Sequence, residues 1–212
     1  MPLASHPTLI PLPAELRSER VLLRPLAAED AEAVFAAIEE ARDHLRPWMD
    51  WVDNHRSVAD SRDYCLRCAA KWLLRNDLAL GIFDAQTGGY LGRTGMHDPD
   101  WSLCSFEIGY WIRPTAEGRG YVGEAVGLLV RLAFEHLNAR RLEIRCDAAN
   151  ERSRRVAEKT GFILEGTLRN DSLTVGGEPR STLVFSLIPE DYARLVGPST
   201  GVAETVERAP GD

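Results

Sequence analysis

The stretch Gly118-Arg119-Gly120-Tyr121-Val122-Gly123-Glu124-Ala125 decides the fold, because it places three glycines between two strongly patterned segments. Upstream, residues 106–112 are aromatic and β-branched, which is typical of a strand. Downstream, apolar residues recur at helical spacing from Val122 to Ala133. Residues 118–123, which we call the glycine joint, therefore connect a strand to a helix.

The glycine joint has the features of an anion site. Glycine adopts backbone angles closed to other residues and lets a ligand come close, so successive N–H groups can converge on one phosphate oxygen. The dipole of the following helix adds partial positive charge at the same place. Taken alone, the segment leaves two interpretations open, a phosphate site and a merely flexible turn.

The spacing G-x-G-x-x-G also matches the fingerprint of dinucleotide-binding proteins. That fingerprint requires the glycines directly after a strand, a further βαβ unit and an acid about twenty residues on. Here residues 113–117 intervene, and Glu143, the acid near that spacing, lies inside the next expected strand. The chain after residue 161 reads as paired strands. The context disfavours a nicotinamide-dependent oxidoreductase.

Composition limits the class of protein. A length of 212 residues suits one domain with a real core, and 44% hydrophobic with 27% charged residues is ordinary for a soluble globule. The net charge of -7 argues against a broad nucleic-acid footprint. With no apolar run near the roughly 20 residues of a membrane span, no signal peptide and scattered cysteines, we expect a cytoplasmic protein that binds neither nucleic acid nor membrane.

Cys65 and Cys68 form a C-x-x-C pair that invites a metal or redox interpretation. They share a helical stripe with Ala69 and Trp72, however, and no second Cys or His pair lies at zinc spacing. The pattern favours burial in a helix, and we expect no metal.

The order of the elements predicts a single mixed α/β domain. Prolines in residues 1–18 indicate a flexible lead, residues 19–192 form the domain, and residues 193–212 are expected to be a disordered tail. Periodicity predicts helices at 31–42, 59–75 and 150–160 besides the one after the glycine joint, and strands at 21–26, 78–84, 90–97, 102–112, 141–146, 162–169 and 182–188. These elements give a mostly antiparallel sheet of six to seven strands flanked by helices.

Four motifs in a fixed order resemble the GNAT superfamily of acyl-CoA-dependent N-acyltransferases. They are Glu107-Ile108-Gly109-Tyr110-Trp111-Ile112, Gly118-Arg119-Gly120-Tyr121-Val122, Asn150-Glu151-Arg152-Ser153 and Glu158-Lys159-Thr160-Gly161-Phe162. The resemblance implies a single-domain GNAT-like fold whose sheet is splayed between the fourth and fifth strands.

Within that superfamily the chain is similar to the Rim-type ribosomal-protein N-terminal acetyltransferases. This similarity is carried by Leu22-Leu23-Arg24-Pro25-Leu26, Leu45-Arg46-Pro47-Trp48 and Leu183-Val184-Phe185-Ser186-Leu187. It covers residues 19–192. Two residues depart from the family pattern: Glu117 stands where Gln, Arg or Trp is usual, and Val122 replaces a small residue.

The resemblance implies acetyl-CoA as co-substrate. Its diphosphate would lie on the amides of the glycine joint, and its pantetheine arm between the strands that end near Arg113 and Asp147. Asn150, a natural helix N-cap, would also contact pantetheine. The residues expected to bind it are Ile112, Arg113, Gly118, Arg119, Gly120, Tyr121, Val122, Gly123, Asn150 and Ser153.

Acetyl transfer needs a neutral amine, a polarised thioester carbonyl and a proton for the departing thiolate. Glu107 is the first candidate base because its strand borders the acetyl group, although it could instead be a surface or salt-bridged glutamate. Asp171 is the second. Ser153 is placed to donate to the thiolate or merely to satisfy its helix end. Amides near residues 110–112, freed by a bulge, are the expected oxyanion donors.

The sequence says less about the residues that bind the acceptor. Trp48, Met49 and Trp51 could form a wall of the acceptor site or fill the core. The histidines at 44, 55, 97 and 136 have no sequence companions that indicate a triad or a metal.

We therefore expect an N-acetyltransferase that moves an acetyl group to a primary amine by direct attack. The acceptor is a peptide N-terminus or a small molecule. A catalytically degenerate CoA-binding or sensing module is the alternative, and a homodimer is left open.

Overall fold

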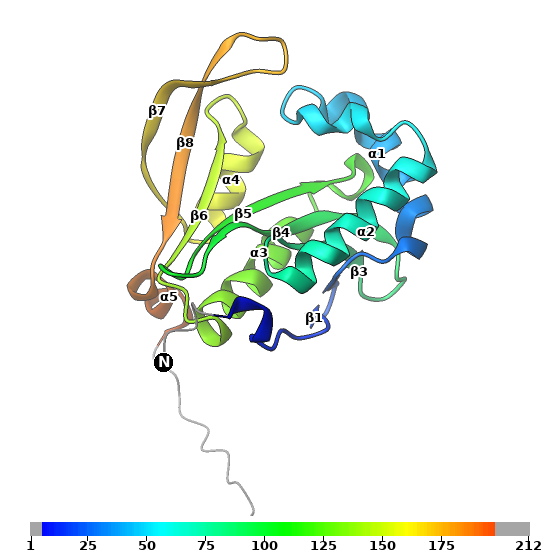
Figure 1. Cartoon of the computed structure of the whole chain (residues 1–212). Coiled ribbons are helices and arrows are strands. Elements are labelled where there is room, and N and C mark those ends of the chain that lie inside the picture. Colours follow the sequence, from blue (N-terminus) through cyan, green and yellow to red (C-terminus); the bar gives the residue numbers. More distant parts are fainter. Residues whose placement is uncertain (1–5, 198–212) are drawn as a thin grey trace, which may run out of the picture.

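The computed structural model describes residues 6–197. Within that range the chain forms eight strands and five α-helices (Figure 1). The strands are β1 (Leu16–Arg17), β2 (Val21–Arg24), β3 (Leu78–Asp84), β4 (Tyr90–Asp100), β5 (Ser105–Ile112), β6 (Arg141–Asp147), β7 (Ile163–Leu173) and β8 (Pro179–Leu187). The helices are α1 (Ala31–Leu45), α2 (Val58–Leu74), α3 (Tyr121–Arg131), α4 (Glu151–Lys159) and α5 (Pro189–Val196).

One parallel pair interrupts an otherwise antiparallel sheet. The strand order is β1-β2-β3-β4-β5-β6-β8-β7, and only β5 and β6 run parallel, joined by a crossover through α3. Their pairing is limited to residues 105–107 against 141–143. Beyond it the two halves of the sheet diverge (Figure 1). This splay lies between the strands for which it was expected.

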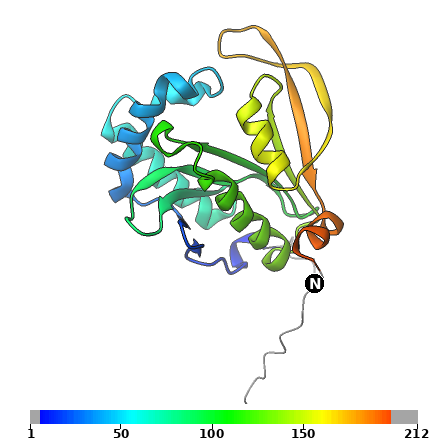
Figure 2. The same cartoon turned by 180° about the vertical axis from the view of Figure 1, so that it is seen from behind.

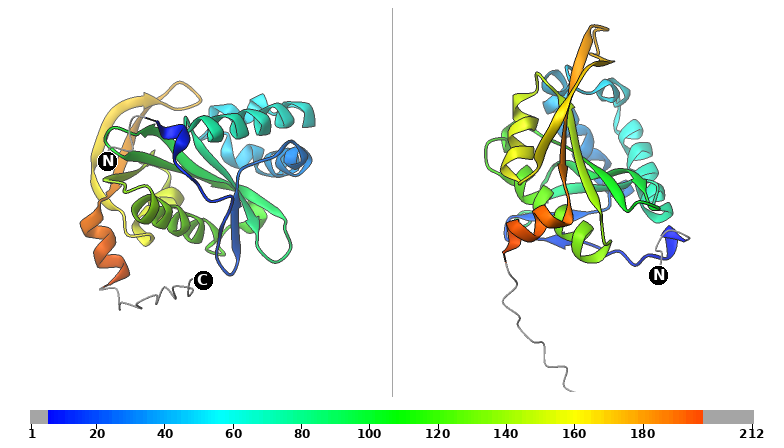
Figure 3. Two further views of the ribbon diagram at one scale, coloured as in Figure 1. Left: turned by 60° about the horizontal axis from the view of Figure 1, so that its bottom comes forward. Right: turned by 90° about the vertical axis from the view of Figure 1, so that its left-hand side faces the viewer.

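The sheet has a helical layer on each face. Figure 3 shows α3 on one side and α1 with α2 on the other, and Figure 2 shows α3 and α4 from behind. Side chains alternate along β5: Phe106 and Ile108 belong to the core with α3, whereas Trp111 belongs to the core with α1 and α2. Successive residues of β5 and β6 therefore face opposite layers.

Most predicted elements are confirmed. The strand expected at 78–84 is β3 with the same bounds, and Asn150 caps α4, its Oδ1 accepting from the amide of Ser153. The sheet has eight strands because two-residue β1 was missed, and α5 was also missed. Strand β7 is longer than expected, since two register shifts break its alternation along an exposed edge.

Part of the expected flexible lead packs against the domain. Ile10 is buried, and its carbonyl accepts from Arg75 at 2.9 Å. Ser18 donates to Glu124 of α3 at 2.5 Å. The end of the expected tail, residues 198–212, lies outside the described residues.

Cys65 and Cys68 are buried on α2, as the helical stripe predicted. Burial raises the pKa of the Cys65 thiol to about 12. No helix among residues 6–197 is both long and apolar enough to cross a membrane.

Candidate active site

A cavity of about 740 Å³ occupies the splay between β5 and β6. Tyr110 and Ser153 line it from the α3 and α4 side of the sheet. Gly109, Trp111 and Asp147 line it from the opposite side. Because alternate residues of the same strands line it, the cavity runs through the sheet from one face to the other.

The glycine joint forms one end of this cavity. Gly118 and Gly120 have φ values of +72° and +84°, which side-chain-bearing residues adopt only with strain. A Cβ on Gly118 would meet nothing within 4 Å, so the backbone angle and not space requires glycine there. Gly120 is the N-cap of α3 and offers no side-chain cap, which leaves the first-turn amides for a ligand.

The joint is fastened from outside the cavity. Arg20 donates to the carbonyl of Arg119 at 3.0 Å and pairs with Glu124 at 2.6 Å. Tyr121 donates to Asp84 at 3.0 Å. Of the residues expected to bind the cofactor, Arg113 pairs with Glu40 and, like Arg119, is not part of the cavity lining.

The negative charge of Glu117 has two basic side chains close to it. Its Oε1 lies 2.6 Å from Nε2 of His44, at the end of α1, and its Oε2 lies 3.4 Å from the guanidinium of Arg152 on α4. All three residues line the cavity. The negative charge that the sequence places beside the anion site therefore has basic partners on both neighbouring helices.

Ser153 and Tyr110 place two hydroxyl groups in the middle of the cavity. The phenol oxygen of Tyr110 lies 3.0 Å from Oγ of Ser153 and 3.1 Å from its carbonyl oxygen. Burial raises the pKa of the Tyr110 phenol, so this hydroxyl stays protonated and can donate. Because Asn150 satisfies the Ser153 amide, the serine hydroxyl is free for this partnership.

The two predicted bases lie beside the cavity and not in its lining. Glu107 belongs to the part of β5 that still pairs with β6, and burial raises its pKa. Asp171 lies on β7, 3.8 Å from Arg145. Their catalytic roles stay predictions.

The edge of β5 that faces β6 is open beyond Glu107, because the partner strand turns away there. The register shift of the β4–β5 pair lies instead between His97 and Asp100. Any amide near residues 110–112 that points toward β6 would therefore be left unpaired by the splay and not by a bulge, and its role as an oxyanion donor stays a prediction.

Residues 46–57, which we call the aromatic loop, contribute another part of the cavity wall. Trp48 and Met49 line the cavity, whereas Trp51 packs on Trp111 with ring centroids 6.0 Å apart. Trp51 thus fills the core, while Trp48 and Met49 form part of a cavity wall, and their role at the acceptor site stays a prediction.

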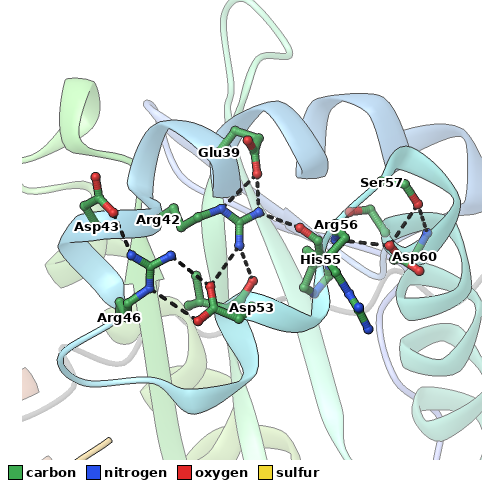
Figure 4. Close-up of polar contacts among 11 residues, drawn as sticks. Glu39, Arg42, Asp43, Arg46, Asp53, His55, Arg56, Ser57 and Asp60 are labelled. Carbon is green, nitrogen blue, oxygen red and sulfur yellow. Dashed lines mark hydrogen bonds and ion pairs between the residues drawn. The ribbon is translucent and has the colours of Figure 1, made fainter. Parts of the chain in front are cut away.

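Arg42 of α1 and Arg46, the first residue of the loop, hold the aromatic loop in place (Figure 4). Arg42 donates to the carbonyls of Val52 and His55 and pairs with Asp53. Arg46 reaches the same aspartate at 3.0 Å. The loop is therefore fixed by one arginine of the preceding helix and one at its own start.

A second cavity of about 620 Å³ adjoins the first between the aromatic loop and the β7–β8 hairpin. The two cavities share Trp48, Asp147 and Arg180. Asp147 is 9% exposed, accepts from the amide of Ala149 and lies 3.5 Å from Arg180. This pair stands at the junction of the two spaces.

Sequence reasoning missed several residues of the site. Asp147 and Arg180 come from adjacent strands, and the partnership of His44 with Glu117 joins segments 73 residues apart. No motif spacing signals such pairs. His97 also has a companion, since its Nδ1 lies 3.0 Å from Asp77. Among residues 6–197 no group of three or more His, Cys, Asp or Glu side chains is arranged to hold a metal ion.

Comparisons with known proteins match this architecture. Residues 20–163 match the family model described as an acetyltransferase (GNAT) domain. The ribosomal-protein-serine acetyltransferase of Escherichia coli (strain K12) is 38% identical over 72% of this chain and 84% of its own length. YdaF of Bacillus subtilis (strain 168), provisionally named a ribosomal N-acetyltransferase, is 30% identical over 82% of this chain and 94% of its own.

Among solved structures, the microcin C7 self-immunity acetyltransferase MccE, crystallised with acetyl-CoA and AMP, superposes with a TM-score of 0.76. It is 22% identical and covers 81% of this chain and 93% of its own length. At 22% identity this similarity shows a shared fold and nothing further.

Proposed function

The chain belongs to the GNAT acetyltransferase family and is an N-acetyltransferase that uses acetyl-CoA as co-substrate; we propose that its acceptor is the α-amine at the N-terminus of a protein. The observation that carries this proposal is the cavity that runs through the sheet, with the glycine joint at one end and Asp147 at the other.

The residues present fit acetyl-CoA. Glycines with left-handed backbone angles leave the amides of α3 open to a diphosphate, and the unpaired edge of β5 can receive the amides of a pantetheine arm. The thioester then reaches the centre of the cavity, where Tyr110 and Ser153 can donate to the sulfur as it departs.

The acceptor side has room for more than an amine. The second cavity continues from Asp147 and Arg180 between the aromatic loop and the β7–β8 hairpin, where Pro47 and Val175 add apolar surface. A peptide can place its first amine beside Asp147 and its following residues in this space. The names of the two relatives support a ribosomal protein as the acceptor.

The test is release of free CoA thiol from acetyl-CoA in the presence of a panel of acceptors. Peptides that copy ribosomal-protein N-termini should release thiol, while the same peptides with a blocked N-terminus should not. Mass spectrometry should place the acetyl group on the first residue. Turnover with small amines alone would identify a small-molecule enzyme instead. Cofactor binding without any acceptor-dependent release would identify a degenerate module.

A further inference from the structure

Asp77 and His97, which the sequence leaves unconnected, form a pair on the α1 and α2 side of the sheet. Nδ1 of His97 lies 3.0 Å from Oδ1 of Asp77, and Arg93 reaches the same carboxylate at 3.3 Å. Burial alone would disfavour the charged carboxylate, but the hydrogen bond with His97 and the nearby cations outweigh it and lower the pKa of Asp77. An ionised Asp77 accepts from Nδ1–H of His97.

The other nitrogen of His97 lies against a residue that lines the cavity, while His97 itself is outside the lining. A Cβ built on Gly109 would lie 2.8 Å from Nε2 of His97, and Gly109 lines the cavity. Gly95 stands opposite Gly109 in the β4–β5 register, so neither position contributes a side chain. The imidazole therefore lies over the backbone of β5 just past the residues where β5 parts from β6.

Strand β4 is irregular at this point. Its register against β5 shifts between His97 and Asp100, and Asp98 has a φ of +44°. Such irregularities redirect side chains and often stand next to active sites. Here the irregularity begins at His97, whose ring lies against Gly109 of the cavity wall.

On the basis of the proposed function, we propose that His97 is the base of the acetyl transfer and that Asp77 holds it in the reactive tautomer. The nitrogen lone pair of the amine attacks the thioester carbonyl carbon, and the C–S bond breaks. The proton lost by the amine passes to Nε2 of His97, and the sulfur receives one proton from the hydrogen-bonded pair of Tyr110 and Ser153 hydroxyls, which regains a proton from solvent. The side chain of His97 is 23% exposed and can return its proton to solvent.

In this proposal Glu107 is not the base but a residue beside it. It stands opposite His97 in the β4–β5 register, and neither residue is part of the cavity lining. The two side chains interact, since burial raises the pKa of Glu107 while Arg145 and His97 act to lower it. The other charged groups around the pair are Arg93 and Lys71 near Asp77, Asp98 along β4, and Glu143 and Arg145 beyond Glu107.

The experiment compares His97→Gln, Asp77→Asn and Glu107→Gln with His136→Gln, an exposed histidine outside the site. For His97→Gln we expect kcat to fall about 10²-fold, the typical value of a lost general base, with acetyl-CoA affinity within about twofold of wild type. The fall should be smaller for Asp77→Asn and Glu107→Gln, and absent for His136→Gln. Imidazole added to the assay should restore part of the rate of His97→Ala, which a purely structural role would not allow.

Wild-type kcat in His97→Gln, or a larger fall in Glu107→Gln without imidazole rescue, would overturn this assignment. Nitrogen NMR of His97 gives a readout that needs no turnover. The proton should sit on Nδ1, and a proton on Nε2 in the free enzyme at neutral pH would contradict the inference. If the wild type binds acetyl-CoA but acetylates no acceptor, the proposed function fails, and the NMR result still decides the state of His97.

Discussion

The glycine joint and the aromatic loop line the same cavity, but different forces fix them. The glycine joint is shaped by its own backbone, since Gly118 and Gly120 adopt left-handed angles that open the amides of α3. The aromatic loop is shaped by side chains, since Arg42 and Arg46 hold its carbonyls and Asp53. The comparison teaches that the glycine joint depends on local conformation, whereas the aromatic loop, the proposed acceptor end, depends on contacts that a single substitution can remove.

The largest effect should follow a change at the glycine joint. Gly120→Ala places a side chain at a φ of +84°, which costs about 1–2 kcal/mol and turns the first amides of α3 away from the ligand. We expect the Kd for acetyl-CoA, measured by calorimetry, to rise about tenfold. The matched control is Gly127→Ala, where a Cβ on α3 would meet nothing within 4 Å. An equal loss in both variants would mean that backbone angle does not define this end.

The second prediction tests whether the aromatic loop and the glycine joint act independently. Arg42→Met removes a guanidinium that two loop carbonyls share, at a cost of about 1–3 kcal/mol in unfolding free energy. We expect a several-fold rise in KM for the acceptor with an unchanged Kd for acetyl-CoA. Arg67→Met, which breaks an exposed pair with Asp63 on α2, should leave both constants unchanged. A weakened cofactor in Arg42→Met would show that the two ends are not independent.

A smaller effect should appear at Glu117, which lies between the glycine joint and the end of α1. Glu117→Gln removes a negative charge beside the diphosphate site and frees Arg152 and His44 from it. We expect acetyl-CoA to bind about two- to threefold more tightly at low salt, with the gain shrinking as ionic strength rises. Weaker binding would mean that Glu117 serves the site by positioning Arg152.

The smallest effect concerns the link between α1 and the segment that leads to the glycine joint. Hydrogen bonds from Arg113 and Thr115 lower the pKa of Glu40 to about 2. Because the folded-state pKa lies below the ordinary 4.5, this carboxylate stabilises the fold above pH 4.5 and its contribution is lost as the pH falls toward 2. As a pair near the surface it is worth at most about 1 kcal/mol.

The measurement is urea unfolding of the wild type and Glu40→Gln between pH 7 and pH 3. The difference in unfolding free energy should be constant down to about pH 4.5 and shrink below it. A difference that grows toward acid pH would contradict the sign of this argument.

The same contrast explains what the sequence could predict. Strand β3, the glycine joint and the Asn150 cap were predicted because each depends only on residues that are close together in the sequence. The partnership of His97 with Asp77 depends on sheet register and on two facing glycines, which periodicity does not encode. Strand β1 was missed because two residues carry no alternation, and the short α5 follows a strand within one residue.

The opening of the cavity on both faces of the sheet has a kinetic consequence. Under the proposed function the two substrates would enter from opposite faces, so both could be present at once and neither product would have to leave before the second substrate enters. Initial-rate plots against one substrate, at several fixed levels of the other, should therefore give lines that intersect rather than run parallel.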